Sequence, residues 1–347
     1  MKRVVFVTQQ IDPGHPALAA TVPKLKALAA LVEEVVVLAD GVVEEALPAN
    51  CRVRTFRSAT RAGRGARFEA ALVQELGGLR GGRGAVVAHM CPIYAVLAAP
   101  LVRPLRIPLV LWFTHWKASR LLHAAERLST AVASVDRRSF PLASGKLHAI
   151  GHGIDLGEFP CVAAAEGEGS LRLLALGRYS RAKGLDTVVR AVAEIPEASL
   201  EVHGPTLSDD ERAHRAELER LVRDLGLDGR VTLADAVPRS QLPELFRTHD
   251  ALVNNMRAGA PDKVVYEAAA SCVPVLASNP VFDSLLEPEQ RFAREDPESL
   301  AERIRALAAL DDGERAALGR RLRERVEESH SVESWAEGIL RAAAGEP

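Results

Sequence analysis

The 347-residue sequence has few aromatic residues and few cysteines, and each shortage excludes some classes of protein. Aromatic residues make up 4% of the chain and the net charge is −2, which argues against a nucleic-acid-binding protein. The four cysteines (Cys51, Cys91, Cys161 and Cys272) are far apart and form no CxxC pair. This spacing argues against a zinc site or a disulfide framework and predicts a protein of the reducing cytosol.

Long apolar runs are also scarce. The apolar stretch after the initial MKR is about four residues long, too short for the central region of a signal peptide. Residues 85–102 (AVVAHMCPIYAVLAAPLV) are nearly long enough to span a membrane. Because His89 and Pro92 interrupt this run, it favours a buried strand over 85–89 followed by a helix over 93–102.

The common nucleotide-binding signatures are missing as well. The chain contains no GxGxxG fingerprint and no GxxxxGK[ST] loop, so an NAD site or a P-loop is not indicated. It also contains no DxD motif, and the sequence predicts neither a metal site nor a bound cofactor.

What is present is a regular alternation of short apolar runs and helical stretches. The length predicts two domains, and 48% hydrophobic residues can fill two cores. The predicted strands cover residues 4–8, 34–39, 51–56, 85–89, 109–115, 131–135, 146–151, 171–177, 199–204, 231–235, 251–255 and 274–278. Apolar strands separated by helices indicate α/β domains with doubly wound parallel sheets.

A segment of small and polar residues, 156–170, separates the two series of strands and predicts an interdomain linker. The first domain is then 1–155 and the second 171–329, with a final helix over 330–347. Two such domains present the carboxyl ends of their strands to a common cleft, so ligand-binding motifs are expected directly after strands.

Charge is unevenly distributed between the halves. Residues 1–155 contain 20 Lys and Arg against 11 Asp and Glu, whereas the remainder contains 24 against 35. The basic excess is concentrated in Arg52, Arg54, Arg57, Arg61, Arg64, Arg67, Arg80 and Arg83. These arginines form either a solvated surface or a contact with an anionic partner such as a membrane or a phosphorylated lipid.

The first motif after a strand is LALGRYSRAKGLDTVVRA, residues 174–191. The strand ends at Gly177, Arg178 and Lys183 bracket a polar turn, and Gly184 precedes a helix. Two cations near a helix N-terminus suit a diphosphate, although an ordinary surface turn has the same composition.

A second motif, AGAPDKVVYEAAASCVPVLAS, follows the strand at 251–255. A helix is expected from about Asp262, and its first-turn amides can hold phosphate or sugar oxygens. Glu267 lies about one and a half turns into that helix, where a carboxylate can accept two hydrogen bonds from a ribose diol. The alternative is a solvated helix residue.

Three weaker motifs lie in the first domain. In HAIGHGID (148–155), Gly151 and Gly153 imply positive φ or a close backbone approach, and His152 is either a ligand contact or a turn residue. His115 stands at the end of the strand in LWFTHWKAS. Gly14 lies in the loop after the first strand, where backbone approaches a ligand.

Taken in order, these motifs resemble those of family 4 glycosyltransferases, over nearly the whole chain and most strongly from Lys146 to Ser278. The resemblance implies a GT-B fold, with two Rossmann-like domains and a C-terminal helix (330–347) packing back on the first. GRYSRAKGLD is similar to the family's donor-diphosphate signature, which makes Gly177, Arg178 and Lys183 donor residues.

The resemblance assigns roles to further residues. HAIGHGID is similar to the family's interdomain P-N-G-V-D segment, with His152 in place of Asn. The segment 231–255 resembles the base-binding strand, loop and helix, which puts the nucleobase near Ala236 and Val237. DKVVYEAAASCVPVLAS is similar to the end of the Glu, seven residues, Glu motif, and the loop of Asp262 and Lys263 belongs to the donor site. Glu267 matches the ribose ligand, and His115 matches the histidine that contacts the transferred sugar.

One residue departs from the family pattern. The first glutamate of the pair would stand at Gly259, and in the family that carboxylate contacts the sugar. Some relatives carry a short lysine-containing turn here, similar to Asp262–Lys263. The departure leaves the identity of the sugar open.

The resemblance implies a cytoplasmic retaining hexosyltransferase that uses a nucleotide-diphosphate sugar and a glycan or lipid-linked acceptor, with peripheral contact to an anionic membrane. No second carboxylate is available for a double displacement, so a metal-independent front-face substitution is expected, with His115, Arg178 and Lys183 as the catalytic set. Two alternatives stay open: a nucleotide-sugar-binding pseudoenzyme and a nucleotide-sugar 2-epimerase of the same fold.

Overall fold

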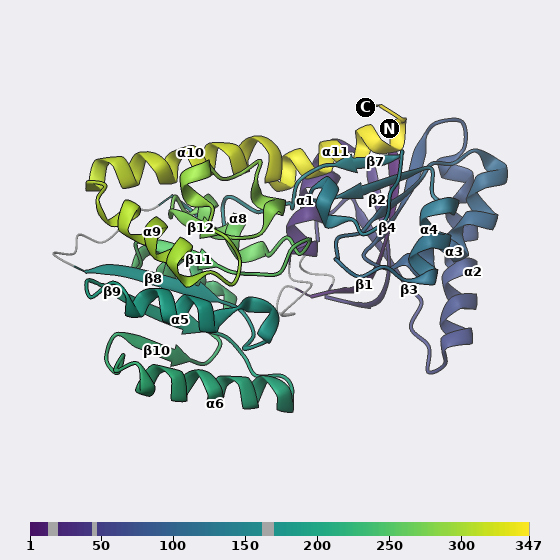
Figure 1. Ribbon diagram of the computed structural model, residues 1–347. Coiled ribbons are helices and arrows are strands. Elements are labelled where there is room, and N and C mark those ends of the chain that lie inside the picture. Colours follow the sequence, from purple (N-terminus) through teal and green to yellow (C-terminus); the bar gives the residue numbers. More distant parts are fainter. Residues whose placement is uncertain (13–19, 44–46, 162–169, 347) are drawn as a thin grey trace. The chain divides into compact units, whose positions relative to one another are not determined.

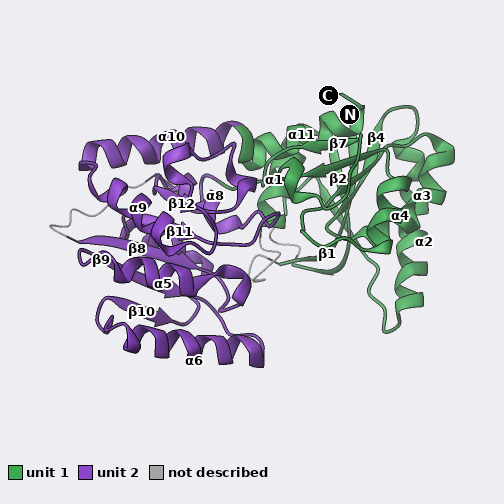
Figure 2. Cartoon of the chain, viewed as in Figure 1, with its two compact units in different colours: residues 1–155, 329–347 green, residues 156–328 purple. Residues whose placement is uncertain are grey.

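The computed structural model describes residues 1–12, 20–43, 47–161 and 170–346 (Figure 1). The chain divides into two compact units, coloured separately in Figure 2. Unit 1 comprises Met1–Asp155 and Ser329–Pro347, and unit 2 comprises Leu156–Glu328. Residues 156–161, which the sequence assigns to a linker, thus belong to unit 2.

Unit 1 is built on a parallel sheet with strand order β3-β2-β1-β4-β5-β6-β7. Its strands are β1 (Arg3–Ile11), β2 (Glu34–Val42), β3 (Cys51–Thr55), β4 (Gly84–His89), β5 (Leu109–Trp112), β6 (Ala131–Ser134) and β7 (Leu147–Ala149). Its α-helices are α1 (Thr21–Leu31), α2 (Arg61–Leu79), α3 (Pro92–Val102), α4 (Arg120–Leu128) and α11 (Val332–Ala344).

The sheet of unit 1 is covered on both faces because alternate residues of each strand point to opposite sides. Val5 and Val7 of β1 join one apolar cluster with residues of α2, α3 and α4. On the other face, the ring of Trp335 from α11 packs edge-on against Phe6 of β1 and Trp112 of β5, with centroid distances of 6.4 and 5.7 Å. This double burial explains the continuous apolar runs in the sequence.

Unit 2 has a parallel sheet with strand order β10-β9-β8-β11-β12. Its strands are β8 (Leu171–Leu176), β9 (Ala198–His203), β10 (Val231–Ala234), β11 (Ala251–Asn254) and β12 (Val275–Ala277). Its helices are η4 (Arg181–Lys183), α5 (Leu185–Ala193), α6 (Asp209–Asp224), η5 (Arg239–Gln241), α7 (Leu242–Arg247), α8 (Lys263–Ala270), η6 (Pro280–Phe282), η7 (Pro288–Gln290), α9 (Pro297–Ala308) and α10 (Asp312–His330, of which the last two residues fall in unit 1).

The order of strands in unit 2 reverses between β8 and β11. Chain connections run from β8 through β9 to β10 on one side, and β11 begins the other side, next to β8. In a doubly wound sheet this switch point opens a crevice at the carboxyl ends of the strands, where ligands bind. The loops after β8 and β11 therefore meet at this crevice.

Both doubly wound sheets confirm the predicted α/β fold class, and every predicted strand occurs among the described residues. The apolar run at 85–102 forms β4 and α3, and none of the helices in the described ranges is long and apolar enough to cross a membrane. At the C-terminal end, Ser331 caps α11 by accepting a hydrogen bond from the amide of Ser334, which separates α10 from α11.

The arginine-rich segment is partly neutralised by ion pairs within unit 1, which neither interpretation of the sequence included. Arg52 and Arg54 bind the buried carboxylate of Glu75 at 2.7 Å each, and Arg52 also binds Glu34 at 2.9 Å. These two arginines therefore hold β3 to α2, and their side chains stay 40% and 37% exposed.

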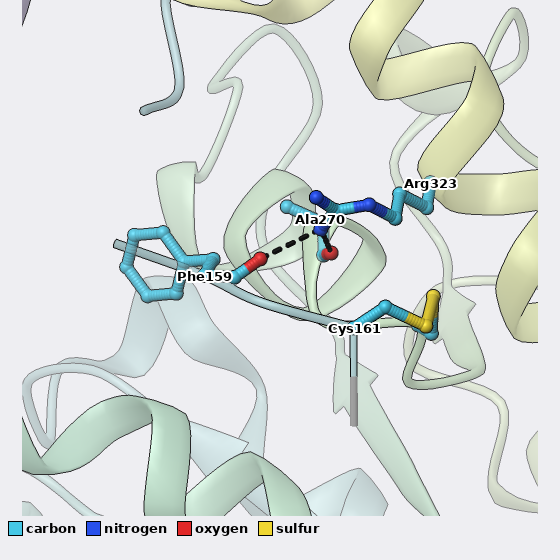
Figure 3. Close-up of a disulfide and its surroundings, with 5 residues drawn as sticks. Phe159, Cys161, Ala270 and Arg323 are labelled. Atoms are coloured by element: carbon cyan, nitrogen blue, oxygen red, sulfur yellow. Dashed lines mark hydrogen bonds between the residues drawn. A yellow bond between two sulfur atoms is a disulfide. The ribbon is translucent and has the colours of Figure 1, made fainter. Parts of the chain in front are cut away.

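The expectation that the cysteines form no disulfide is wrong. Cys161 and Cys272 are joined in unit 2 across 111 residues of sequence (Figure 3), whereas Cys51 and Cys91 are free. The prediction failed because separation along the chain says nothing about distance in a folded α/β domain. The pairing also removes the cysteine argument for a reducing compartment.

We predict that protein purified without reductant and then denatured shows two reactive thiols per chain, and four after reduction. Cys161→Ser should lower the melting temperature by roughly 5–15 °C, because a disulfide typically adds about 2–4 kcal/mol. Cys51→Ser, the control, should remove one reactive thiol and leave the melting temperature nearly unchanged. Four reactive thiols in the unreduced protein would contradict the pairing.

Candidate functional site

The loop after β8 folds a lysine back over the end of its own strand. Gly177, at φ 130°, follows β8, and a Cβ on it would lie 2.2 Å from Nζ of Lys183. That ammonium donates to the carbonyl of Leu176 at 2.9 Å. Glycine at 177 is therefore required for Lys183 to occupy the carboxyl end of the sheet.

A second glycine joins this loop to the one after β11. Gly184 has φ 55° and starts α5, and a Cβ there would lie 2.4 Å from Nδ2 of Asn255. Asn255 donates to the carbonyl of Gly184 at 3.0 Å, and the amide of Arg257 donates to the carbonyl of Ala182 at 3.0 Å. The two loops at the switch point are thus fixed to one another by backbone and amide groups.

Lys183 also forms an ion pair with Asp262 across the switch point. Asp262 is the N-cap residue of α8, but its side chain makes no capping hydrogen bond. Its Oδ2 instead accepts from Lys183 and, at 2.8 Å, from Nδ2 of Asn254. The carboxylate orients the lysine and leaves the first-turn amides of α8 to other acceptors.

The other predicted phosphate cation is more exposed. The side chain of Arg178 is 58% accessible and lies 3.2 Å from Oε1 of Glu211, in the first turn of α6. Glu211 itself is buried and accepts from the amide of Leu207 at 2.7 Å. Arg178 is therefore oriented by a fixed carboxylate while most of its guanidinium surface stays open to solvent.

Gly259, where the family pattern has a glutamate, lies in a braced turn. Its φ is 78°, and its amide donates to Oδ1 of Asn279 at 3.2 Å. The amide group of Asn279 donates in turn to the carbonyls of Arg257 and Ala260, both at 2.8 Å. Because a glutamate would be strained at this φ, the turn is built for glycine.

Glu267 on α8 is buried, with 2% of its surface exposed, which contradicts the alternative of a solvated helix residue. Its Oε1 accepts from Nη1 of Arg239 at 2.5 Å and lies 3.0 Å from Nζ of Lys263. Burial alone raises the pKa of Glu267, but the charges of Lys263 and Arg239 outweigh it and hold that pKa below its usual range. The carboxylate is therefore ionised at neutral pH.

Ala236 and Val237 follow β10, at the same edge of the sheet as the loops after β8 and β11. Ala236 is exposed and Val237 half-buried. The end of β10 is fixed by the hydroxyl of Tyr179, which donates to the carbonyls of Ala234 at 2.7 Å and Val202 at 3.1 Å. Ala236 and Val237 can make apolar contacts with a planar aromatic ring, and their backbone groups can form hydrogen bonds with it.

The remaining predicted residues lie in unit 1. His115 is exposed, follows β5, and accepts from the amide of Lys117 at 3.0 Å. Burial and the charge of Lys117 lower the pKa of His115. His152 is buried between Gly151 and Gly153, whose φ values of 77° and 78° confirm the predicted positive φ. Gly14 falls outside the described residues.

The residues predicted for the diphosphate and the ribose thus come from the segments after β8 and β11 in unit 2, where Lys183 contacts Asp262 and Glu267 contacts Lys263. His115 and His152 belong to unit 1. Sequence reasoning missed Arg239, although it lies only two residues beyond Val237. It also missed the amide side chains that brace the loops. Among the residues described, no group of three or more His, Cys, Asp or Glu side chains is placed to hold a metal ion.

Comparison with known proteins identifies the kind of domain. Residues 163–325 match the family model for glycosyl transferases group 1. The chain is 29% identical over 179 residues to D-inositol 3-phosphate glycosyltransferase 1 of Catenulispora acidiphila, a match that covers 46% of this chain and 42% of that relative. The chain therefore spans less than half the length of this curated relative, and its residues 163–325 are similar to glycosyl transferases group 1.

Solved structures identify the fold. Sucrose-phosphate synthase from Thermosynechococcus elongatus is similar with a TM-score of 0.75 and 19% identity, over 99% of both chains. Anabaena HepE, solved in complex with UDP, is similar with a TM-score of 0.77 and 18% identity, over 99% of this chain and 100% of that one. The chain has the GT-B fold of these proteins.

We predict that Glu267→Gln lowers the free energy of unfolding at pH 7 by about 2 kcal/mol, the usual range for hydrogen bonds to a charged group. Because the folded-state pKa of Glu267 is lowered, its stabilisation is present above the unfolded pKa and is lost as pH falls below about 4.5. Denaturant unfolding of both proteins at pH 7 and pH 3.5 should show the difference shrinking in acid. Glu244→Gln, which removes an exposed carboxylate, is the control; a difference independent of pH would contradict the assignment.

Proposed function

We propose that the protein is a retaining glycosyltransferase that moves a sugar from a nucleotide-diphosphate donor to a glycan or lipid-linked acceptor without a metal ion. The proposal is based mainly on the position of Lys183. Its ammonium lies at the switch point of a group 1 glycosyltransferase domain, fixed by Asp262 and the carbonyl of Leu176. This cation is already oriented before a diphosphate arrives.

The donor-binding roles follow from the positions of the side chains in unit 2. Lys183, Arg178 and the first-turn amides of α8 hold the diphosphate, Glu267 accepts from the ribose hydroxyls, and the base lies against Ala236 and Val237. Gly177 and Gly259 let backbone approach the donor. These assignments come from the resemblance together with the geometry of the loops.

The chemical step is a front-face substitution. The bond between the anomeric carbon and the diphosphate oxygen breaks, and the acceptor oxygen bonds to the same face of that carbon. The acceptor proton passes to the departing diphosphate, so no separate base is required. Arg178 and Lys183 stabilise the negative charge that develops on the leaving group, which is the role that a divalent cation has in other enzymes.

His115 and His152 receive their roles from the resemblance alone. We propose that His115 contacts the transferred sugar and that His152 belongs to the donor-binding set. A lowered pKa keeps His115 neutral at physiological pH, so it presents a hydrogen-bonding group and no charge.

We predict that Lys183→Ala lowers turnover at least a hundredfold, since removing one charge-stabilising donor costs about 2.7–4 kcal/mol in the barrier. The fold should stay intact, and the loss of the ion pair with Asp262 should lower the melting temperature by only a few degrees. Arg190→Ala, which removes an exposed cation from α5, is the matched control and should retain activity. Near-normal turnover of Lys183→Ala would exclude the proposed role.

Gly259 favours a second candidate, a nucleotide-sugar-binding protein without transfer activity. The turn at Gly259 offers no carboxylate to the sugar, and a glutamate there would be strained. The two candidates differ in one measurement. Slow donor hydrolysis or transfer that is lost in Arg178→Ala supports the transferase, whereas donor binding without any turnover supports the pseudoenzyme.

The acceptor side is proposed from unit 1. Arg57, four residues before α2, and Arg61, its first residue, are exposed, and we propose that they contact an anionic acceptor or membrane surface at the cytoplasmic face. With Arg52 and Arg54 neutralised by Glu75 and Glu34, this basic surface is smaller than the sequence suggests. Cytoplasmic placement is no longer supported by the cysteine spacing and stands as part of the proposal.

We predict that the protein binds vesicles containing 30% phosphatidylserine at low salt and is released at 0.5 M salt. Replacing Arg57 and Arg61 by serine should weaken binding roughly thirtyfold, at about 1 kcal/mol per basic residue. Replacing Arg220 and Arg223 of α6 by serine is the charge-matched control. Equal vesicle binding by the two double variants would contradict the proposed surface.

A further inference from the structure

The carboxylate of Glu267 is held by one of its two oxygens. Both Arg239 and Lys263 contact Oε1, at 2.5 and 3.0 Å. An ionised carboxylate with both lone pairs of one oxygen occupied still has the other oxygen to accept hydrogen bonds. The arrangement therefore fixes the carboxylate without consuming its whole accepting capacity.

Arg239 is the more fixed of the two cations. Its Nη1 binds Glu267, while its Nε and Nη2 donate to Oε2 of Glu158 at 3.1 and 2.7 Å. Its guanidinium carbon lies 5.1 Å from the centre of the Phe159 ring. A planar guanidinium that donates from three nitrogens and lies beside an aromatic ring has little conformational freedom. A lysine could not make the same set of contacts.

Two partners of Arg239, Glu158 and Phe159, belong to a short segment, Leu156–Cys161, which we call the strap. Phe159 of the strap is 1% exposed, and its ring centre lies 6.1 Å from that of Phe246. The carbonyl of Phe159 accepts from Nη1 of Arg323 at 2.7 Å, and the same nitrogen donates to the carbonyl of Ala270 in α8 (Figure 3). The strap is thus bound to the helix that carries Glu267.

The disulfide closes the strap onto the end of that same helix. Cys161 is the last described residue of the strap, and Cys272 follows α8 with φ 61°. A left-handed conformation after a helix normally selects glycine, because other side chains are strained there. A cysteine at this position accepts that strain and supplies the covalent attachment, five residues beyond Glu267.

We propose that Arg239 is a positioning residue for ribose recognition, held in place by the strap and its disulfide. This inference rests on the proposed function, because it assumes that Glu267 binds the ribose of a nucleotide donor. Arg239 orients the carboxylate so that Oε2 accepts from the ribose hydroxyls, and Glu158 keeps Arg239 from turning away. Because the strap fixes Arg239, disrupting the strap should weaken the binding of nucleotides that carry a 2′-hydroxyl.

The test compares ribose and 2′-deoxyribose ligands, which separates positioning from a general loss of structure. Dissociation constants of UDP, GDP and ADP and of their 2′-deoxy forms are measured by calorimetry on the full chain. For the tightest pair, the wild type should prefer the ribose form at least tenfold. Arg239→Gln should reduce this preference to threefold or less while leaving the affinity for the deoxy form within threefold of wild type.

Three further variants complete the experiment. Arg247→Gln breaks an exposed ion pair on the neighbouring helix α7 and should keep the full preference. Glu158→Gln leaves the contact between Arg239 and Glu267 in place and should partly reduce the preference for the ribose form. This variant tests the inference if Arg239→Gln is unstable. Cys161→Ser should also reduce it, because the strap loses its attachment.

The outcomes distinguish the inference from the proposed function. An unchanged preference in Arg239→Gln, or an equal weakening of both ligand forms, overturns the positioning role. An unchanged preference in Cys161→Ser overturns the role of the disulfide. Failure of the wild type to bind any of the six nucleotides overturns the proposed function itself, and the inference with it.

Discussion

The candidate site depends on the parallel pairing of β8 with β11. This pairing places the first strand of one half of the unit 2 sheet beside the first strand of the other half, so the loops that follow the two strands are neighbours. Lys183 comes from the first loop and Asp262 from the second, so their ion pair exists only because the strands are neighbours. Two residues 79 positions apart in sequence thereby form one ion pair at the carboxyl ends of these strands.

The fold could be predicted from the sequence to a large extent. Strands buried on both faces give continuous apolar runs, and each such run in the sequence became a strand of a parallel sheet. The boundaries were less accurate: the run ending at His115 forms a strand only as far as Trp112. Beyond Trp112 the chain leaves the sheet, and local composition does not mark that point.

The positions of candidate site residues were predictable where a motif has a fixed place after a strand. Lys183, Asp262 and Glu267 satisfied that condition, and the structure places them at one edge. Their mutual contacts were not predictable, because ion pairs such as Lys183–Asp262 and Arg239–Glu267 join distant parts of the sequence. The Cys161–Cys272 disulfide was missed for the same reason. Cys272 stands after α8, where a glycine is common. Its partner, Cys161, could be identified only in the folded chain.

The central claim is that this edge of unit 2 binds a diphosphate by protein cations alone. The most direct measurement is calorimetric titration with UDP, GDP and ADP and with the corresponding monophosphates, each with and without EDTA. The account predicts that the best diphosphate binds at least tenfold more tightly than its monophosphate and that EDTA changes neither affinity. Equal affinities for diphosphate and monophosphate, or binding that disappears with EDTA, would contradict it.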